Sequence, residues 1–201
     1  MLERFRDFWG DLFTPVARLL LRLGVSPDAV TVVGTLGVCF GALWFFPRGE
    51  LWVGVLVVTA FVFADLVDGL MARLSGRSSS WGAFLDSTLD RFGDAAVFGG
   101  LVMFYVGPGD SEWLAALALY CLVMGNLTSY ARARAESLGM QAKGGIAERA
   151  DRLVLILVAT FFADVLGFLP LLVAALVLLA VASTVTVVQR MVGVRRQALQ
   201  A

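Results

Sequence analysis

Residues 65–90 read DLVDGLMARLSGRSSSWGAFLDSTLD, and this segment decides the fold because it places charges between two strongly apolar runs. The run before it, residues 51–64, reads LWVGVLVVTAFVFA, and the run after it, residues 95–107, reads AAVFGGLVMFYVG. Each run, together with the adjoining part of residues 65–90, is long enough for a helix that crosses a bilayer, which needs about 20 residues. Because a short polar turn, LSGRSSSW, joins them, we expect two neighbouring antiparallel helices.

The composition of the whole chain predicts an integral membrane protein, because 59% of its 201 residues are hydrophobic. A soluble domain of this length is nearer half apolar. The formal net charge is zero, so charge gives no indication of a nucleic-acid partner. The chain has no histidine, which excludes histidine-based acid–base chemistry, Ser-His-Asp triads and zinc sites with histidine ligands.

Six apolar stretches are long enough to span a membrane, and we expect one all-α, polytopic membrane domain over residues 1–201. The predicted spans are residues 28–47, 50–74, 82–106, 112–136, 150–169 and 171–192. Residues 1–24 interleave aromatic and charged side chains at helical spacing. This pattern favours an amphipathic juxtamembrane helix that precedes the six-helix bundle of residues 28–192.

Most arginines fall in the termini and in alternate connections between the predicted spans, whereas the opposite connections hold only Arg48 among positive residues. The positive-inside rule therefore predicts that both termini and the polar turn lie in the cytoplasm. We expect a plasma-membrane protein whose active site faces the cytoplasm.

Four aspartates of the opening segment are expected to form one cluster. Asp65 and Asp68 are three residues apart, and Asp86 and Asp90 are four apart, so each pair lies on one face of its helix. An unpaired carboxylate inside a bilayer costs about 2.5–3.5 kcal/mol, so we expect a wet cavity with a positive partner. Oxygen ligands favour Mg²⁺, Mn²⁺ or Ca²⁺ over zinc, and four carboxylates suit two divalent ions that hold a pyrophosphate.

Other interpretations of this segment remain open from the residues alone. A salt-bridge cluster with Arg73, Arg77 and Arg91 would also neutralise the aspartates. Gly69 and Ala72 remove bulk from the acidic face, either for a ligand or for close packing of another helix. An ion-coupled transporter is an alternative of another class, because acidic residues within membranes also carry ions. The clustering of the acids toward one membrane face, without an inverted repeat, favours an enzyme.

A second polar stretch, residues 129–152, reads SYARARAESLGMQAKGGIAERADR and holds more positive charge than a cytoplasmic flank requires. Arginine binds phosphate through paired N–H donors, so we expect an acceptor-phosphate site here, with Arg190 near the end of the last span. A topological or lipid-headgroup patch is the alternative.

The acidic segment resembles the signature of the CDP-alcohol phosphotransferase family. The pattern Asp65-x2-Asp68-Gly69-x2-Ala72-Arg73-x8-Gly82-x3-Asp86-x3-Asp90 matches that signature at all eight positions, with every spacing kept. The resemblance implies an integral membrane homodimer that cleaves a CDP-lipid with two divalent ions, Mg²⁺ or possible Mn²⁺. The implied metal ligands are Asp65, Asp68, Asp86 and Asp90. Asp90 would also be the general base, and the implied nucleotide site is Gly69, Ala72 and Arg73.

The second polar stretch is similar to that of actinobacterial phosphatidylinositol phosphate synthases, a subfamily whose acceptor is inositol 1-phosphate. This resemblance implies transfer of the phosphatidyl group of CDP-diacylglycerol to inositol 1-phosphate, with release of CMP. The implied acceptor contacts are Arg132, Arg134, Arg149, Arg152 and Arg190, with Ser129 and Asp28 as further candidates. Phosphatidylglycerophosphate synthases usually carry a GK-x-KT type of loop that is absent here, so glycerol 3-phosphate is the alternative acceptor.

Small residues such as Gly99, Gly100 and Gly125 are candidates for the dimer contact.

Overall fold

The computed structural model describes residues 13–76, 79–142, 144–146 and 148–200, without the side chains of residues 64–66. Within these ranges the chain forms helices and no strand, which confirms the all-α fold class. Residues 13–22 form a first helix. The later elements are α2 (Pro27–Phe45), the 3-10 turn η1 (Phe46–Arg48), α3 (Leu51–Ser75), α4 (Ser80–Val106), α5 (Glu112–Ser137), α6 (Arg149–Val165) and α7 (Pro170–Ala198).

Local capping sequences set the ends of the helices around the polar turn. The hydroxyl of Ser79 precedes α4 and accepts a hydrogen bond from the backbone N–H of Gly82 at 3.0 Å. Ser26 precedes α2 in the same way and accepts from Ala29 at 3.2 Å. Gly76 ends α3 with a left-handed φ of 64°, which only glycine adopts without strain from a Cβ. The antiparallel turn predicted from the sequence thus has a glycine stop and a serine start.

Two helix ends differ clearly from the predicted spans. α6 ends at Val165, before the predicted residue 169, because Gly167 takes a left-handed φ of 64° and its N–H bonds back to the carbonyl of Asp164. α7 continues to Ala198, beyond the predicted residue 192, because the helix outlasts its apolar pattern. The last turns of α7 carry Arg195 and Arg196.

Within the described residues, four helical segments are long and apolar enough to cross a membrane, which supports an integral membrane protein. They are Pro27–Arg48, Leu51–Ser75, Glu112–Ser137 and Pro170–Ala198. α4 carries several charged residues in its first half, and α6 has 17 residues. Both pack in the same bundle as the four apolar helices. The count of six spans therefore stays a prediction.

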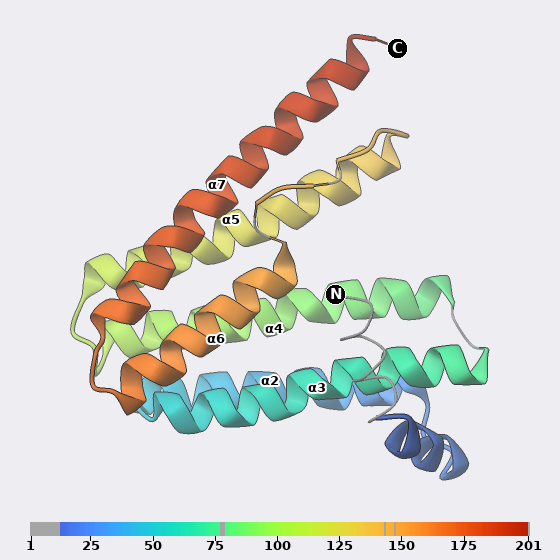
Figure 1. Ribbon diagram of the computed structural model, residues 1–201, viewed down its shortest axis with the longest axis horizontal. Coiled ribbons are helices and arrows are strands. Elements are labelled where there is room, and N and C mark those ends of the chain that lie inside the picture. The colour runs from blue at the N-terminus through green and yellow to red at the C-terminus, as the bar shows by residue number, and fades with distance from the viewer. Residues whose placement is uncertain (1–12, 77–78, 143, 147, 201) are drawn as a thin grey trace.

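The helices form a bundle whose polar connections gather at one end. α2 packs against α3 and α4, α5 against α4 and α7, and α6 against α3 and α7. In Figure 1 the ends of α3, α5 and α7 and the helix of residues 13–22 lie at one end of the bundle, and η1 with the α4–α5 and α6–α7 connections lies at the other. The arginine-rich segments therefore share one end, while the side of the membrane that this end faces stays a prediction.

The helix of residues 13–22 lies against α3. Its Ala17 is fully buried and packs with Val67 and Met71 of α3, whereas Val16 and Leu19 are exposed. The exposed apolar side chains are consistent with a helix on the membrane surface. The first half of the predicted juxtamembrane helix, residues 1–12, lies outside the described residues.

Two of the three glycines proposed for a dimer contact are used inside the chain. A Cβ at Gly100 would lie 2.7 Å from the backbone oxygen of Ala42, so this glycine lets α4 approach α2. A Cβ at Gly125 would lie 3.3 Å from Nε of Arg152. Both glycines are buried, so they are not open to a second chain. At Gly99 an added Cβ meets no atom within 4 Å, and this position remains a candidate for the dimer contact.

Candidate functional site

Residues of the acidic segment line a groove together with the start of α2. The groove is about 240 Å³ in volume and is lined by Pro27, Asp28, Thr31, Asp68, Gly69, Ala72, Ser79, Gly82, Ala83 and Asp86. Asp68 is buried and accepts a hydrogen bond from the hydroxyl of Thr31, whereas Asp86 is exposed. An added Cβ at Gly69 would meet no atom of the described residues within 4 Å. Gly69 therefore keeps the groove open and does not serve close packing between helices.

The groove supplies oxygen donors of the kind that divalent ions prefer. Asp68 and Asp86 both line it, and their carboxylates suit a hard cation. Asp65 lies on α3 one turn before Asp68, and its side chain is outside the described residues. Among the side chains that are described, no group of three or more His, Cys, Asp or Glu lies close enough to hold a metal ion. The predicted cage of four aspartates therefore stays a prediction.

A larger cavity, of about 680 Å³, lies beside Asp90 between α4, α5 and α6 and reaches α7. Five of the predicted acceptor residues line it, namely Ser129, Arg132, Arg149, Arg152 and Arg190. Arg152 and Arg190 are only 3% and 6% exposed. Two guanidinium groups with so little access to water, beside those of Arg132 and Arg149, form a strongly positive site, which favours an anionic ligand.

Local structure explains how these arginines come together. α6 begins at Arg149, where the Asp151 carboxylate accepts a hydrogen bond from the N–H of Glu148 at 3.2 Å. Arg149 and Arg152 are three residues apart, so both side chains leave the same face of α6. Arg190 of α7 donates to the carbonyl oxygen of Thr128 on α5 and, at 3.0 Å, to that of Gly144.

The connection between α5 and α6 is fixed on α7. The side chain of Gln197 accepts from the backbone N–H of Gln141 at 2.9 Å and donates to the carbonyl oxygen of the same residue at 2.6 Å. Thr186 accepts a further hydrogen bond from the N–H of Ile146 at 3.1 Å. These contacts hold the segment that leads to Arg149, so the part of α7 beyond the predicted span helps to build the cavity.

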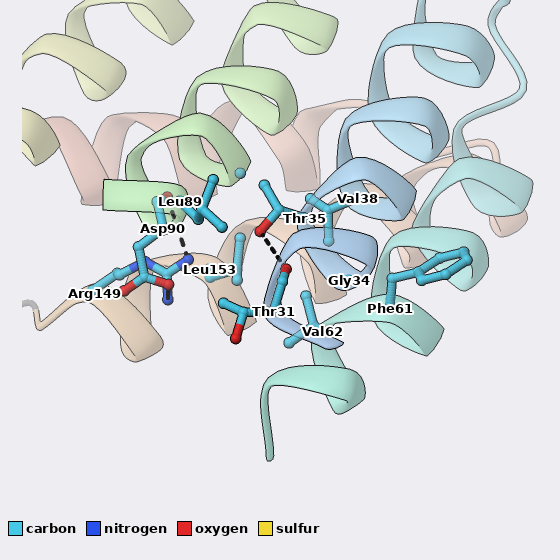
Figure 2. A pocket seen from close by; sticks show the side chains of 11 residues that line it. Thr31, Gly34, Thr35, Val38, Phe61, Val62, Leu89, Asp90, Arg149 and Leu153 are labelled. Carbon is cyan, nitrogen blue, oxygen red and sulfur yellow. Dashed lines mark hydrogen bonds and ion pairs between the residues drawn. The ribbon is translucent and has the colours of Figure 1, made fainter. Parts of the chain in front are cut away.

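Asp90 is part of the cavity wall and pairs with Arg149. Nη1 of Arg149 lies 2.7 Å from Oδ1 of Asp90, and its Nη2 donates to the Asp90 backbone oxygen at 3.4 Å. Figure 2 shows this pair beside a small cavity of about 40 Å³ that Thr31 and Thr35 of α2 also line. Thr31 belongs to the groove as well, and Asp90 to the large cavity. The groove and the arginine-lined cavity are therefore neighbours, with Asp90 between them.

Sequence reasoning missed Asp94, which lies one turn after Asp90 on α4 and is buried. Nε of Arg149 lies 3.1 Å from Oδ1 of Asp94, and Nη2 of Arg152 lies 3.8 Å from Oδ2. The signal was present, because Asp94 continues the four-residue spacing from Asp86 to Asp90. The salt-bridge interpretation of the acidic segment is thus correct in part, although the main partner arginine comes from α6.

Three predicted site residues are not brought to the expected places. Asp28 lines the groove and not the arginine-lined cavity. Arg134 is exposed, and its Nη1 donates to the hydroxyl of Ser137 at 3.3 Å. Arg73 is exposed and donates to the carbonyl oxygen of Gly69, outside the groove lining. The binding roles of all three stay predictions.

Curated proteins match this chain over nearly its whole length. The profile of a family described as CDP-alcohol phosphatidyltransferase matches residues 24–188. The phosphatidylinositol phosphate synthase of Streptomyces avermitilis is 52% identical over 208 residues, which cover 100% of this chain and 85% of that protein. The phosphatidylinositol phosphate synthase of Cutibacterium acnes is 53% identical over 206 residues, which cover 98% of each protein.

Solved structures share the fold. The crystal structure of Mycobacterium tuberculosis phosphatidylinositol phosphate synthase with CDP-DAG bound has a TM-score of 0.87 and 43% sequence identity, and the match covers 92% of this chain and 94% of that one. The structure of the same enzyme in complex with manganese and citrate has a TM-score of 0.84 at 43% identity, over 90% and 88% of the two chains. Since the profile matches most of the sequence and the curated relatives match nearly all of it, the chain belongs to the CDP-alcohol phosphatidyltransferase family.

Proposed function

We propose that the chain is a phosphatidylinositol phosphate synthase, which transfers the phosphatidyl group of CDP-diacylglycerol to inositol 1-phosphate and releases CMP. The names of the relatives support this activity, and family membership favours an enzyme over a transporter. The observation that carries the proposal is the arginine-lined cavity beside Asp90. A phosphorylated alcohol bound there would present its phosphate to the arginines and a hydroxyl to the carboxylate.

The remaining lining of the cavity suits a polyol better than a small alcohol. Hydroxyl, amide and carboxylate groups that can bind ring hydroxyls are present, namely Ser87, Thr88, Asn126, Ser129, Glu136 and Glu148. Glu136 is held 3.0 Å from Arg132 by an ion pair. A binding site that combines charged donors for phosphate with acceptors for hydroxyls is expected to discriminate strongly against acceptors that lack either group.

Asp90 is in position to act as the general base. It would take the proton of an inositol hydroxyl as that oxygen forms a bond to the β-phosphorus of CDP-diacylglycerol, while the bond from this phosphorus to the CMP oxygen breaks. Arg149 contacts Asp90 and also lines the cavity, so it can bind the acceptor phosphate while a hydroxyl of the acceptor faces the base. The groove beside Asp90 would hold the nucleotide, with Gly69 and Ala72 leaving room for it.

Asp65, Asp68, Asp86 and Asp90 would hold two divalent ions, Mg²⁺ or Mn²⁺. Such ions neutralise the charge of the pyrophosphate and of the departing CMP. Support comes from the carboxylates in the groove and from the manganese complex of the Mycobacterium tuberculosis enzyme.

The proposed location is the plasma membrane, with both termini and the site on the cytoplasmic side. Its support is the gathering of arginine-rich connections at one end of the bundle. The homodimer stays a prediction.

Filling the groove at Gly69 is expected to weaken the binding of CDP-diacylglycerol without unfolding the protein. Gly69→Ala and Gly69→Leu place side chains where a Cβ meets none of the described atoms within 4 Å. We expect the KM for CDP-diacylglycerol to rise stepwise by about 3-fold and 30-fold or more, at an unchanged melting temperature. Gly193→Leu, an open position on α7, is the matched control. An unchanged KM in both Gly69 variants would place the nucleotide elsewhere.

The acceptor assignment is tested by measuring CMP release with four acceptors: inositol 1-phosphate, free inositol, glycerol 3-phosphate and serine. We expect inositol 1-phosphate to exceed each of the others in kcat/KM by at least about 100-fold, because both the phosphate and the ring hydroxyls are bound. The highest rate with glycerol 3-phosphate would assign the alternative acceptor. A high rate with free inositol or serine would contradict a phosphate role for the arginine-lined cavity.

A further inference from the structure

Asp94 has the properties of a residue that acts through its neighbours. Its side chain is 9% exposed, and it is absent from the described lining of both the groove and the large cavity. Three arginines of the cavity nevertheless contact it: Arg149 lies 3.1 Å from Oδ1, whereas Arg152 and Arg91 lie 3.8 Å and 3.9 Å from Oδ2. Asp94 thus lies behind the cavity wall, on the side of these guanidinium groups away from the ligand space.

The contacts of Asp94 help to orient the guanidinium groups of Arg149 and Arg152. Arg149 meets Asp94 through Nε at 3.1 Å and Asp90 through Nη1 at 2.7 Å, so two carboxylates of α4 hold one planar group from two edges. Arg152 meets Asp94 through Nη2 at 3.8 Å, and the same nitrogen donates to the carbonyl oxygen of Gly125 at 3.4 Å. The Arg149 guanidinium, held at two edges, has a defined direction, which is what phosphate recognition by arginine requires. Arg152 is held through Nη2 between Asp94 and Gly125.

The packing around Arg152 reinforces this arrangement. Arg152 lies between Asp94 on α4 and Gly125 on α5, where a Cβ at Gly125 would come within 3.3 Å of its Nε. The Arg152 side chain therefore lies so close to α5 that a Cβ at residue 125 would make it shift. Arg152 is buried and Arg149 is half-buried, so the two guanidinium groups would repel each other without an anion, and Asp94 supplies that anion whether or not a ligand is bound.

We propose that Asp94 is a positioning residue of the acceptor site, which holds Arg149 and Arg152 in the orientation that binds the acceptor phosphate. This proposal rests on the proposed function, because it takes inositol 1-phosphate as the ligand of the cavity. It assigns Asp94 no contact with either substrate. Loss of the Asp94 charge should therefore weaken binding of the acceptor, because the two arginines are no longer held. Binding of CDP-diacylglycerol should stay unchanged.

The test compares Asp94→Asn with wild type in purified protein, with separate KM values for inositol 1-phosphate and CDP-diacylglycerol. We expect the KM for inositol 1-phosphate to rise about 10- to 100-fold, and the KM for CDP-diacylglycerol to change less than about 2-fold. Inositol 1-phosphate is expected to raise the melting temperature of the wild type. The same concentration of inositol 1-phosphate should not raise the melting temperature of Asp94→Asn. Equal changes of both KM values, or no change of either, would overturn the proposal.

Two further variants separate positioning from general stability. Asp94→Glu keeps the charge but moves it by one methylene, so we expect a smaller rise of the acceptor KM. If Asp94→Asn does not fold, an unchanged acceptor KM in Asp94→Glu overturns the proposal. Asp164→Asn is the matched control, since Asp164 accepts from the N–H of Trp52 at 2.8 Å at the start of α3, and both KM values should stay at wild-type levels.

A double variant tests whether Asp94 acts through Arg152. The acceptor KM of Asp94→Asn with Arg152→Ala should rise by less than the product of the two single effects, because the residues act as a unit. Effects that multiply would show independent roles and contradict the proposal. If the wild-type protein released no CMP in the presence of inositol 1-phosphate, the proposed function itself would be refuted. This outcome is distinct from a failure of the Asp94 proposal, in which the wild type is active.

Discussion

Asp90→Asn is expected to lower kcat by at least about 100-fold while the protein stays folded and binds CDP-diacylglycerol. A general base contributes about 10²- to 10⁴-fold to such a reaction, and an amide cannot accept the proton of the attacking hydroxyl. The substitution keeps the shape of the side chain beside Arg149, so the wall of the cavity should stay in place. The measurement is CMP release under saturating substrates, together with the melting temperature and the binding of CDP-diacylglycerol.

Asp110→Asn is the matched control for this experiment. Asp110 is an exposed aspartate after α4 at the opposite end of the bundle, and asparagine tolerates its positive φ of 43°. Wild-type activity is expected in the control. If Asp90→Asn kept a kcat within about 3-fold of wild type, Asp90 would not be the base, and another proton acceptor near the groove would have to be sought.

Removal of divalent ions is expected to stop CMP release, by about 1,000-fold or more. Ions of this kind contribute several kcal/mol to the stabilisation of transferred phosphoryl groups, and each 1.36 kcal/mol is a factor of ten in rate. The loss should follow dialysis against a chelator and be reversed by Mg²⁺ or Mn²⁺. Since the chain has no histidine and the groove offers carboxylates, Zn²⁺ should restore the rate poorly.

Turnover that persists after exhaustive chelation would contradict the metal assignment. A control is the melting temperature before and after chelation, because loss of activity through unfolding would lower it. If turnover persisted without divalent ions, the aspartates of α3 and α4 would need another positive partner, and Arg149 is already the partner of Asp90.

The positions of the helices could be predicted from the sequence because apolar runs must match the thickness of a bilayer. That argument fails where a helix ends for another reason. Gly167 stops α6 inside an apolar stretch, and α7 continues as a polar helix that holds the α5–α6 connection through Gln197. Apolar length alone carries neither signal.

The acceptor arginines show a similar limit. Arg132 and Arg134 were both expected at the acceptor, but residues two apart on a helix point in nearly opposite directions, so only Arg132 lines the cavity. This difference could have been predicted from helical spacing. The place of Asp28 could not, because it depends on how the start of α2 packs beside Gly69 and Gly82 in the groove.

Asp94 illustrates what a family signature leaves out. It continues the spacing of Asp86 and Asp90 by one more turn, so the sequence marked it as a member of the same face of α4. Its function as a partner of Arg149 and Arg152 became visible only from the approach of α6 to α4, which joins residues more than 50 positions apart.

The most direct test of the site is the number of Mn²⁺ ions that the purified protein binds, measured by electron paramagnetic resonance in the presence of CDP-diacylglycerol. Two ions per chain are expected in wild type and in Asp110→Asn, and Asp68→Asn and Asp86→Asn should each lose at least one, because the lost carboxylate is a ligand. Wild type that binds no Mn²⁺, or variants that bind as many ions as wild type, would contradict an aspartate-held metal site between α3 and α4.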